Sequence, residues 1–527
     1  MTIAPSSDII LLKTPFEMDD RNQLTFTNAT AQFNYFYNLP KLEYDNCTYQ
    51  RKEGVIRYIT DNNLTYEDLL SYNYCMYRND AYSNKWFYAY IDNIEYKNNG
   101  MTEVSITTDV FQTWQFDIVY KRSFIEREHV NDDTIGLHTI PEQLEHGEYI
   151  NAQNKTDFVY SDTCYIVIAT TEMYDTTRDR PGHLQNGIYS GLIYNIFHNA
   201  GSATAFIDNL DDAGRGGIIN CMFMIPSGLA LSAMCDSYSF DRNNVSYLFY
   251  ILKASTEATN FGAISITRPS HVGTNYTPKN NKLYCWPYNY FVISNNAGVS
   301  AEYHYENFSN ISNIAFNVYA DITPGCSIKA IPLNYKGVTE NVEESINGAK
   351  LPVCSWNTDV YTNWLTQNSV NIGLSYAKSA TSIMGSALTG NVPGIVSGFF
   401  GIADKQAEIY EHSFEPNQAR GNTNSGDVVF STGNSDLNVY YVTIKNEYCK
   451  IIDNFFNTFG YKVNDVKLPN ITGRTNWNYV KSIDINITGD IPQADMQKIK
   501  DIFNAGCTFW HKPAYFLDYS QTNNIVT

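Results

Sequence analysis

The sequence predicts a mainly β protein with some α structure, an α+β chain, and three observations lead to this class. Two runs of alternating apolar and polar residues meet at Asn99-Gly100, a dipeptide typical of a tight β-hairpin. Aromatic residues make up 14% of the chain, with 41 Tyr, and such side chains favour strands and broad polar interfaces. Two amphipathic helices are expected, both after residue 445.

The length and charge of the chain set further limits. A chain of 527 residues is too long for one core, and we expect three or four domains. Its net charge of −19 argues against tight binding of a phosphate backbone, which needs clustered Lys and Arg. An acidic wall is still compatible with DNA that passes without binding, because like charges repel.

The hairpin is expected within residues 84–114. Val104, Ile106 and Thr108 alternate with polar residues, so one face of this hairpin should be buried. Further strands are expected at 164–168, 288–293 and 315–319.

Charged and aromatic residues around this hairpin need an explanation of their own. Arg127 and Glu128 form either an ion pair between subunits or part of a solvated surface. Aromatic side chains dominate core and interface energetics. We therefore expect core or subunit contacts, and no ligand site, for Trp86, Phe87, Tyr88, Trp114 and Trp510.

The two helices are marked by their spacing and their ends. The first has apolar residues at helical intervals and should end at Gly460. The second should begin at Asp490-Ile491-Pro492 and end at Gly506. Each is expected to pack on a sheet. Their apolar positions are Tyr448, Ile451, Ile452, Phe455, Phe456 and Phe459, then Met496, Ile499 and Phe503.

Residues 379–403 read SATSIMGSALTGNVPGIVSGFFGIA and contain no charge. Nine large apolar side chains in this stretch would cost about 13–27 kcal/mol if left in water. Pro393 divides it into arms of about 11–14 residues, each too short as a helix for the ~30 Å hydrocarbon core. Flanking helical patterns predict a helix, an apolar tip and a second helix. The nine side chains are Ile383, Met384, Leu388, Val392, Ile395, Val396, Phe399, Phe400 and Ile402.

Two interpretations of this apolar loop are open. It is a helical hairpin buried in a core, or it is a membrane-active segment sheltered inside an oligomer. The glycine content favours the second, because a static core seldom needs so many flexible positions. Gly390, Gly394 and Gly398 recur every four residues and would allow close helix contact in lipid.

No catalytic or metal-binding pattern occurs in the sequence. GxGxxG, Walker, GxSxG and HExxH motifs are absent, and the nine histidines are dispersed. The two closest cysteines, Cys221 and Cys235, lie 14 positions apart, which predicts free thiols in a reducing cytoplasm. We therefore expect no enzyme activity, no catalytic residues, no cofactor and no metal.

Several blocks in the same order resemble one family over nearly the whole chain. They include NKWFYAYIDNIEYKNNG, TTDVFQTWQFDIVYKRSFIEREHV, KLYCWPYNYFVI and FGYKVNDVKLPN, together with the position of the apolar loop. On these blocks the chain closely resembles the tail knob, or distal tail tube, proteins of small short-tailed podophages that infect Gram-positive bacteria.

The resemblance implies a β-rich tail-tube subunit with an inserted domain and an apolar helical hairpin loop. It implies a homohexamer at the distal end of the tail, made in the host cytoplasm before assembly, whose lumen carries phage double-stranded DNA in transit without tight binding. In this family the apolar loop plugs the lumen and then penetrates the host cytoplasmic membrane. Implied partners are tail collar or connector proteins, a distal tail-tip wall hydrolase and host membrane lipids.

The expected domains combine this resemblance with the pattern of strands and helices. They are a tube-wall β domain (1–140), an inserted outer domain (141–280), a β-rich tube segment (281–355), the helix–apolar loop–helix plug (356–425) and a C-terminal α+β segment (426–527). A receptor-binding tail protein that recognises host cell-wall carbohydrate is the alternative function, and a wall-degrading enzyme is a third. The apolar hairpin favours the conduit, because neither alternative needs it.

Overall fold

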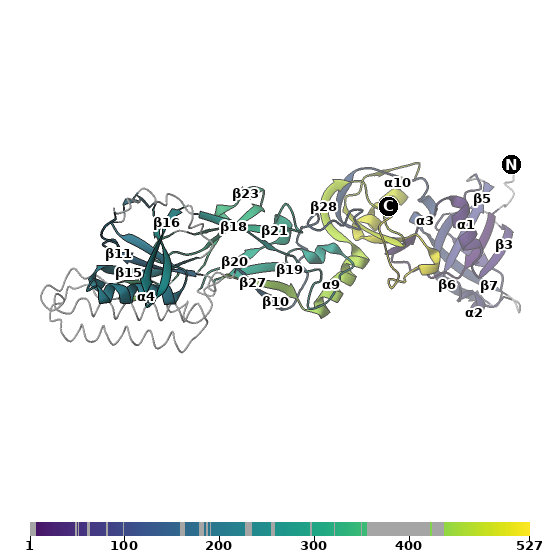
Figure 1. The fold of residues 1–527 in the computed structure, drawn as a ribbon. Helices are drawn as coiled ribbons and strands as arrows, with labels where there is room; N and C mark the ends of the chain where they lie inside the picture. Colours follow the sequence, from purple (N-terminus) through teal and green to yellow (C-terminus); the bar gives the residue numbers. More distant parts are fainter. Residues whose placement is uncertain are drawn as a thin grey trace, which may run out of the picture. The chain divides into compact units, whose positions relative to one another are not determined.

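The structure is a computed structural model, shown in Figure 1. It describes residues 7–355, 422–423 and 437–526, except 48–49, 51, 61–63, 81–82, 99, 159–163, 179–183, 186–187, 190, 227–233, 254–258, 296–297, 321, 349 and 352. The chain divides into two compact units. Unit 1 joins Met1–His146, Pro278–Lys282 and Glu447–Thr527, and unit 2 joins Gly147–Thr277 and Leu283–Asn446. The finer five-part division of the sequence stays a prediction.

Unit 1 contains an antiparallel six-stranded sheet in the order β3-β1-β5-β6-β7-β4. The predicted hairpin is confirmed as β6 and β7, and Val104 and Ile106 are buried on its inner face. The strands are β1 (Ser7–Leu12), β3 (Lys41–Cys47), β4 (Val55–Tyr58), β5 (Tyr74–Asn79), β6 (Phe87–Asn98) and β7 (Met101–Thr108).

The second sheet of unit 1 joins strands from both ends of the chain, in the order β2-β31-β29-β9-β28. Its strands are β2 (Asn22–Leu24), β9 (Ser123–Glu128), β28 (Tyr461–Lys467), β29 (Trp477–Ile483) and β31 (Cys507–Trp510). Only the β2–β31 pair among these is parallel. Strands β8 (Val119–Tyr120) and β30 (Ile487–Thr488) form a separate short antiparallel pair. Along the chain, β8 directly precedes β9 and β30 directly follows β29.

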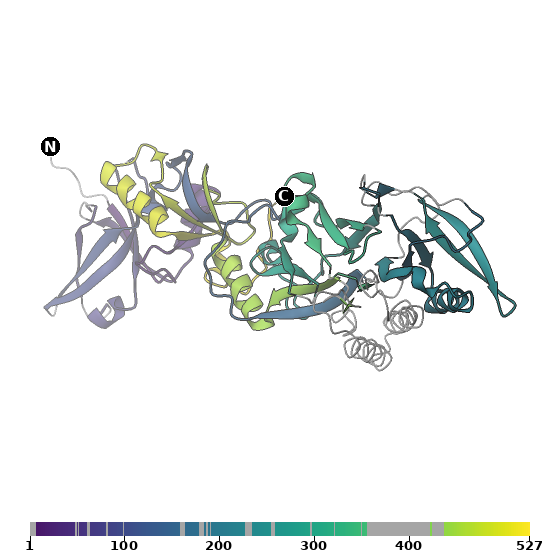
Figure 2. The same cartoon turned by 90° about the vertical axis from the view of Figure 1, so that its left-hand side faces the viewer.

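The helices of unit 1 begin and end where local chemistry dictates. Both predicted C-terminal helices are confirmed, as α9 (Asn446–Phe459) and α10 (Gln493–Ala505), and Figure 2 shows α10 in yellow along the sheet. Gly460 and Gly506 follow them with positive φ, which glycine adopts without steric cost. The other helices are α1 (Ala29–Tyr37), α2 (Tyr66–Leu69) and α3 (Val110–Trp114), capped by side-chain oxygens of Asn28, Thr65 and Asp109.

The aromatic residues near the hairpin pack within their own unit. Phe87, Tyr88 and Trp510 are buried, and Trp86 and Trp114 are half-buried against the same cores. The expectation that they fill cores is confirmed.

Unit 2 is also β-rich, with α4 (Ala200–Asp212) across a seven-stranded sheet in the order β16-β17-β14-β11-β15-β25-β26 (Figure 1). The strands of this sheet are β11 (Cys164–Thr170), β14 (Ile193–Phe197), β15 (Ile219–Pro226), β16 (Cys235–Arg242), β17 (Val245–Leu252), β25 (Val353–Ser355) and β26 (Asn422–Thr423). Side chains of α4 and the sheet form one apolar core. The strand predicted at 164–168 is confirmed as β11.

Two smaller sheets complete unit 2 and share a second core. One has the order β10-β27-β19-β20, from β10 (Tyr149–Phe158), β19 (Asn289–Ser294), β20 (Ser300–Tyr303) and β27 (Leu437–Ile444). The other has the order β18-β21-β22-β23, with β18 (Thr259–Ile266), β21 (Ile314–Ala320), β22 (Lys329–Tyr335) and β23 (Val338–Glu340), and β24 (Ile346–Asn347) pairs with β22. The strands predicted at 288–293 and 315–319 are confirmed as β19 and β21. A separate hairpin joins β12 (Leu184–Gln185) and β13 (Ile188–Tyr189).

Candidate functional site

The residues predicted to act on membranes lie outside the described residues. This holds for the whole plug segment except Asn422 and Thr423. The residues concerned are Ile383, Met384, Leu388, Gly390, Val392, Gly394, Ile395, Val396, Gly398, Phe399, Phe400 and Ile402.

Among the residues that the structure describes, no helix combines the length and apolar character that crossing a bilayer requires. In the same ranges, no group of three or more His, Cys, Asp or Glu side chains is arranged to hold a metal ion. Clusters of buried charge and cavities remain as candidates in the described residues.

A buried carboxylate, Glu142, organises the first cluster, in unit 1. Its side chain is fully buried, and it pairs with both Arg127 and Lys282. It also accepts a hydrogen bond from the backbone N–H of Lys462 at 2.9 Å. Lys282 is itself only 2% exposed, so Glu142 supplies its counter-charge inside the protein.

The structure corrects the expectations for Arg127 and Glu128. Arg127 is largely buried, pairs with Glu142 and donates to the Gly460 carbonyl at 2.8 Å. Glu128 is fully buried, pairs with Lys467 and accepts from the backbone N–H of Asn470 at 2.9 Å. The solvated interpretation is therefore wrong, and each residue already has a partner in its own chain.

A buried carboxylate, Asp453, and a half-buried one, Asp133, hold the short segment Pro278–Lys282 within unit 1. Asp453 accepts hydrogen bonds from the backbone N–H groups of Lys279 and Asn280, at 2.8 and 3.1 Å. Asp133 accepts from the backbone N–H of Asn281 at 2.9 Å, and burial raises the pKa of this carboxyl. Together with Glu142, these carboxylates fix the segment residue by residue, which is a structural role.

His129 is the most buried histidine of this unit, and its ring is fully used. Its Nδ1 accepts from the backbone N–H of Tyr479 at 2.8 Å, so Nε2 carries the proton and faces the Asn457 carbonyl at 3.1 Å. Burial, with Arg474 nearby, lowers the pKa of His129 to about 3. It is a satisfied core histidine, in agreement with the expectation that the dispersed histidines are not ligands.

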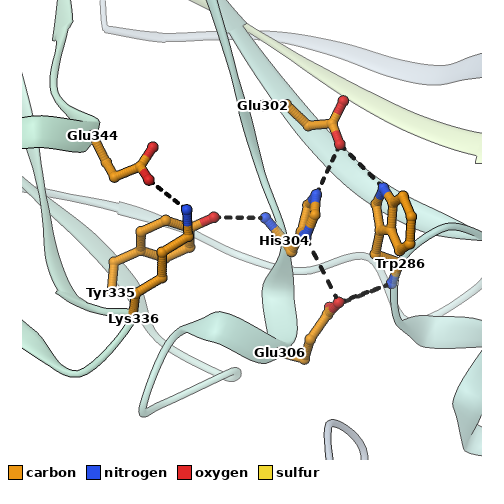
Figure 3. Close-up of polar contacts among 7 residues, drawn as sticks. All are labelled: Trp286, Glu302, His304, Glu306, Tyr335, Lys336 and Glu344. Carbon is orange, nitrogen blue, oxygen red and sulfur yellow. Dashed lines mark hydrogen bonds and ion pairs between the residues drawn. The ribbon is translucent and has the colours of Figure 1, made fainter. Parts of the chain in front are cut away.

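Unit 2 contains a partly exposed cluster around Trp286, shown in Figure 3. His304 lies between two carboxylates, with Nε2 2.8 Å from Glu302 and Nδ1 4.0 Å from Glu306. The Trp286 indole stacks on the imidazole at 5.3 Å between centroids and donates to Glu302 at 3.1 Å. Glu306 accepts from the Trp286 backbone N–H at 3.2 Å, and burial raises the pKa of this carboxyl.

This cluster joins the Trp286 loop to β20 and to the 3-10 turn Tyr305–Asn307 that follows it. On the other side, the Tyr335 hydroxyl accepts from the His304 backbone N–H at 3.4 Å, and Lys336 pairs with Glu344 (Figure 3). The carboxylates of Glu302 and Glu306 already contact Trp286 and His304 within the cluster. The cluster therefore stabilises the fold. Sequence reasoning missed it, and the alternation of Glu302, His304 and Glu306 was the one signal available.

A cavity of ligand size lies in unit 2, with a volume of about 420 Å³. Tyr174, Phe249 and Tyr238 give it aromatic walls, and Asn209 and Arg178 lie among its polar lining residues. The Arg178 guanidinium lies 4.9 Å from the Tyr238 ring centroid. Aromatic walls with a few polar groups are typical of small-molecule pockets.

Comparisons with known proteins place this chain among phage tail proteins. Residues 250–524 match the family model of the C-terminal domain of the tail knob protein gp9 of Bacillus phage phi29, and residues 6–121 match the N-terminus of caudoviral major tail proteins. The chain is 28% identical to the tail knob protein gp9 of Bacillus phage B103, over 98% of each chain. It is 27% identical to tail knob protein gp9 of phi29, over 95% of this chain and 96% of that one.

A solved structure shares the fold. The tail knob protein gp12 of bacteriophage C1 superposes with a TM-score of 0.68 at 17% identity, over 99% of this chain and all of that one. The phi29 model alone covers more than half of this chain, and the relatives align with it from end to end. The chain therefore belongs to the gp9 family of phage tail knob proteins, structural components of the virion tail.

Proposed function

We propose that this tail knob protein forms a homohexameric conduit for genome ejection at the distal end of the tail. In this proposal the apolar loop 379–403 plugs the lumen and later penetrates the host cytoplasmic membrane. The observation that carries the proposal is this uncharged stretch within an acidic chain that aligns from end to end with tail knob proteins.

The charge of the chain supports a conduit for DNA. Six copies carry 6 × −19 = −114 formal charges. A lumen with net negative charge repels the phosphate backbone, so DNA slides through instead of adhering. Binding of double-stranded DNA weaker than about 10⁻⁶ M at physiological salt is expected, since non-specific binders themselves lie near 10⁻⁴–10⁻⁶ M.

The composition of the apolar loop supports the second half of the proposal. Its nine large apolar side chains need cover from water, and the lumen of an oligomer provides it before infection. After release, six loops together can act on a bilayer that one short arm cannot span, because arms tilt or associate through Gly390, Gly394 and Gly398.

Assembly is tested by mass photometry and negative-stain electron microscopy of the purified protein. A six-fold ring with a central channel is expected. A monomer or trimer under all conditions would refute the conduit.

The loop is tested by deleting residues 379–403 and measuring dye release from liposomes. Hexamers should persist while dye release is lost. Phe399→Asp with Phe400→Asp should also weaken release, because charges in hydrocarbon cost about 2.5–3.5 kcal/mol each. Phe399→Leu with Phe400→Leu is the matched control and should retain it. A deletion that prevents folding would instead identify the segment as core.

Recognition of host cell-wall carbohydrate is the second candidate function, and the 420 Å³ cavity of unit 2 favours it. A sugar ring fits such a site because aromatic walls contact its apolar face while polar groups bind its hydroxyls. Tyr238→Ala should then weaken co-sedimentation with host cell walls, whereas Tyr96→Ala, an exposed Tyr of unit 1, should not. Equal binding by both variants would refute this function.

We propose no enzymatic activity for this chain, because assembly accounts for its architecture. Zymography of the pure protein on host cell wall tests this. Soluble products lost on a single carboxylate substitution would contradict it.

A further inference from the structure

We propose that an exposed apolar row on the second sheet of unit 1 is a docking surface for a second copy of this chain. The row consists of Val466, Phe124 and Ile483. This inference rests on the proposed homohexamer and names the surface through which neighbouring subunits meet.

The row follows from the strand register. Phe124 on β9 lies opposite Val466 on β28 and opposite Ile483 on β29. Directly opposite residues on neighbouring strands place their side chains about 4.5–5.5 Å apart on one face. The three side chains therefore form one continuous apolar strip across three strands.

Side chains on the opposite face of the same strands are buried in the core, whereas the side chains of the row are exposed. Ile125, next to Phe124, is completely buried in the core with Val480. By contrast, Val466 is 50% exposed, Phe124 37% and Ile483 57%. Leu468, two residues beyond Val466, is 56% exposed as well. Contiguous exposed apolar surface of this kind marks an interaction site.

One edge of the row carries positive charge, whereas the exposed carboxylates nearest the row are Asp465, next to Val466, and Asp484, next to Ile483. The Arg122 guanidinium donates to the Val466 carbonyl at 3.0 Å, which holds it beside the row, and both Arg122 and Lys121 are exposed. The chain as a whole has 55 acidic and 36 basic residues, so this basic edge is complementary to much of the surface of another copy.

A closed ring of identical subunits needs two different surfaces that fit each other. The segment Glu17-Met18-Asp19 of unit 1 meets the requirements for the second surface. All three residues are exposed, and a large apolar side chain stands between two carboxylates. We assign this segment as the occupant, with Met18 against Phe124, since thioethers pack well on aromatic rings, and with the Glu17 carboxylate facing Arg122. Asp19 pairs with Arg21 of its own chain at 3.4 Å and adds negative charge beside Glu17.

The test is the oligomeric state of full-length variants, measured by mass photometry at one protein concentration. Phe124→Asp and Arg122→Glu should each lose the hexamer, whereas Leu70→Asp, at an apolar position of the same unit that is more exposed than Phe124, should keep it. Circular dichroism and the unfolding temperature establish that each variant is folded. If Phe124→Asp does not fold, the oligomeric state of Arg122→Glu alone tests the docking surface.

A charge exchange tests the assigned occupant. Glu17→Lys with Asp19→Lys should lose the hexamer, and adding Arg122→Glu to the same chain should restore it. Wild-type protein that never forms a hexamer would refute the proposed function. A wild-type hexamer that survives Phe124→Asp and Arg122→Glu refutes the docking surface alone, and a charge exchange without recovery refutes the assigned occupant.

Discussion

Replacing Glu142 by Gln tests how unit 1 is held together. The change keeps the shape of the side chain and an acceptor for the Lys462 backbone N–H, and it removes only the negative charge. Arg127 and Lys282 then lose their shared counter-charge, while Arg127 keeps its bond to the Gly460 carbonyl.

The burial of this cluster determines the size of the effect. Glu142 is fully buried and Lys282 is 2% exposed, so water cannot replace the lost partner. Removing one member of a buried pair costs about 3–5 kcal/mol. At about 2–4 °C per kcal/mol for a unit of this size, the unfolding temperature should fall by roughly 6–20 °C. Glu126→Gln, at a half-exposed pair with Lys481, should cost only about 0–1 kcal/mol.

Scanning calorimetry, with the transition of unit 1 followed for each variant, measures this difference. Adding Lys282→Met to Glu142→Gln should cost less than the sum of the two single changes, because the double variant buries no unpaired ammonium. If Glu142→Gln lowers the unfolding temperature no more than Glu126→Gln does, the reasoning from buried charge is refuted.

Three further predictions concern unit 1. Gly460→Ala should destabilise by more than about 1–2 kcal/mol in chemical unfolding, because Gly460 has φ +64° and a Cβ there would lie 2.1 Å from the Glu128 carbonyl oxygen; an unchanged midpoint would contradict this. Burial raises the pKa of Asp109 from 3.8 to about 7, so its contribution to stability should fall as pH rises from 4 to 7, and Asp109→Asn should remove that part of the pH dependence of the unfolding temperature. His129 has the opposite sign: its pKa is lowered from 6.5 to about 3, so stability should fall as pH drops through this range, and parallel profiles for wild type and His129→Asn would refute it.

Features that depend on neighbouring residues could be predicted from the sequence. The hairpin follows from Asn99-Gly100 and the alternation of apolar and polar residues after it. Helices α9 and α10 follow from the spacing of their apolar residues and from the glycine after the C-terminal end of each. Each signal lies within about 20 residues, where periodicity and turn chemistry decide the structure.

Features that depend on distant residues could not be predicted. Arg127, Glu142, Lys282 and Lys462 each look like an ordinary surface charge in the sequence, and only the fold brings them together. The same is true of the apolar row, because Phe124 and Val466 become neighbours through a pairing across more than 300 residues. The membrane-active loop stays a prediction, because it lies outside the described residues.

The three-segment construction of unit 1 has a consequence for how the chain is made. Strand β9 emerges from the ribosome early, yet both its partners, β28 and β29, belong to the last part of the chain. Domains generally fold as units during synthesis, so unit 1 must wait until residues 447–527 have been made, whereas unit 2 is complete by residue 446. A nascent or prematurely terminated chain therefore lacks the Phe124 row in its finished form. If that row joins subunits, only chains that include β28 and β29 enter the tail, which protects the virion from copies truncated before them.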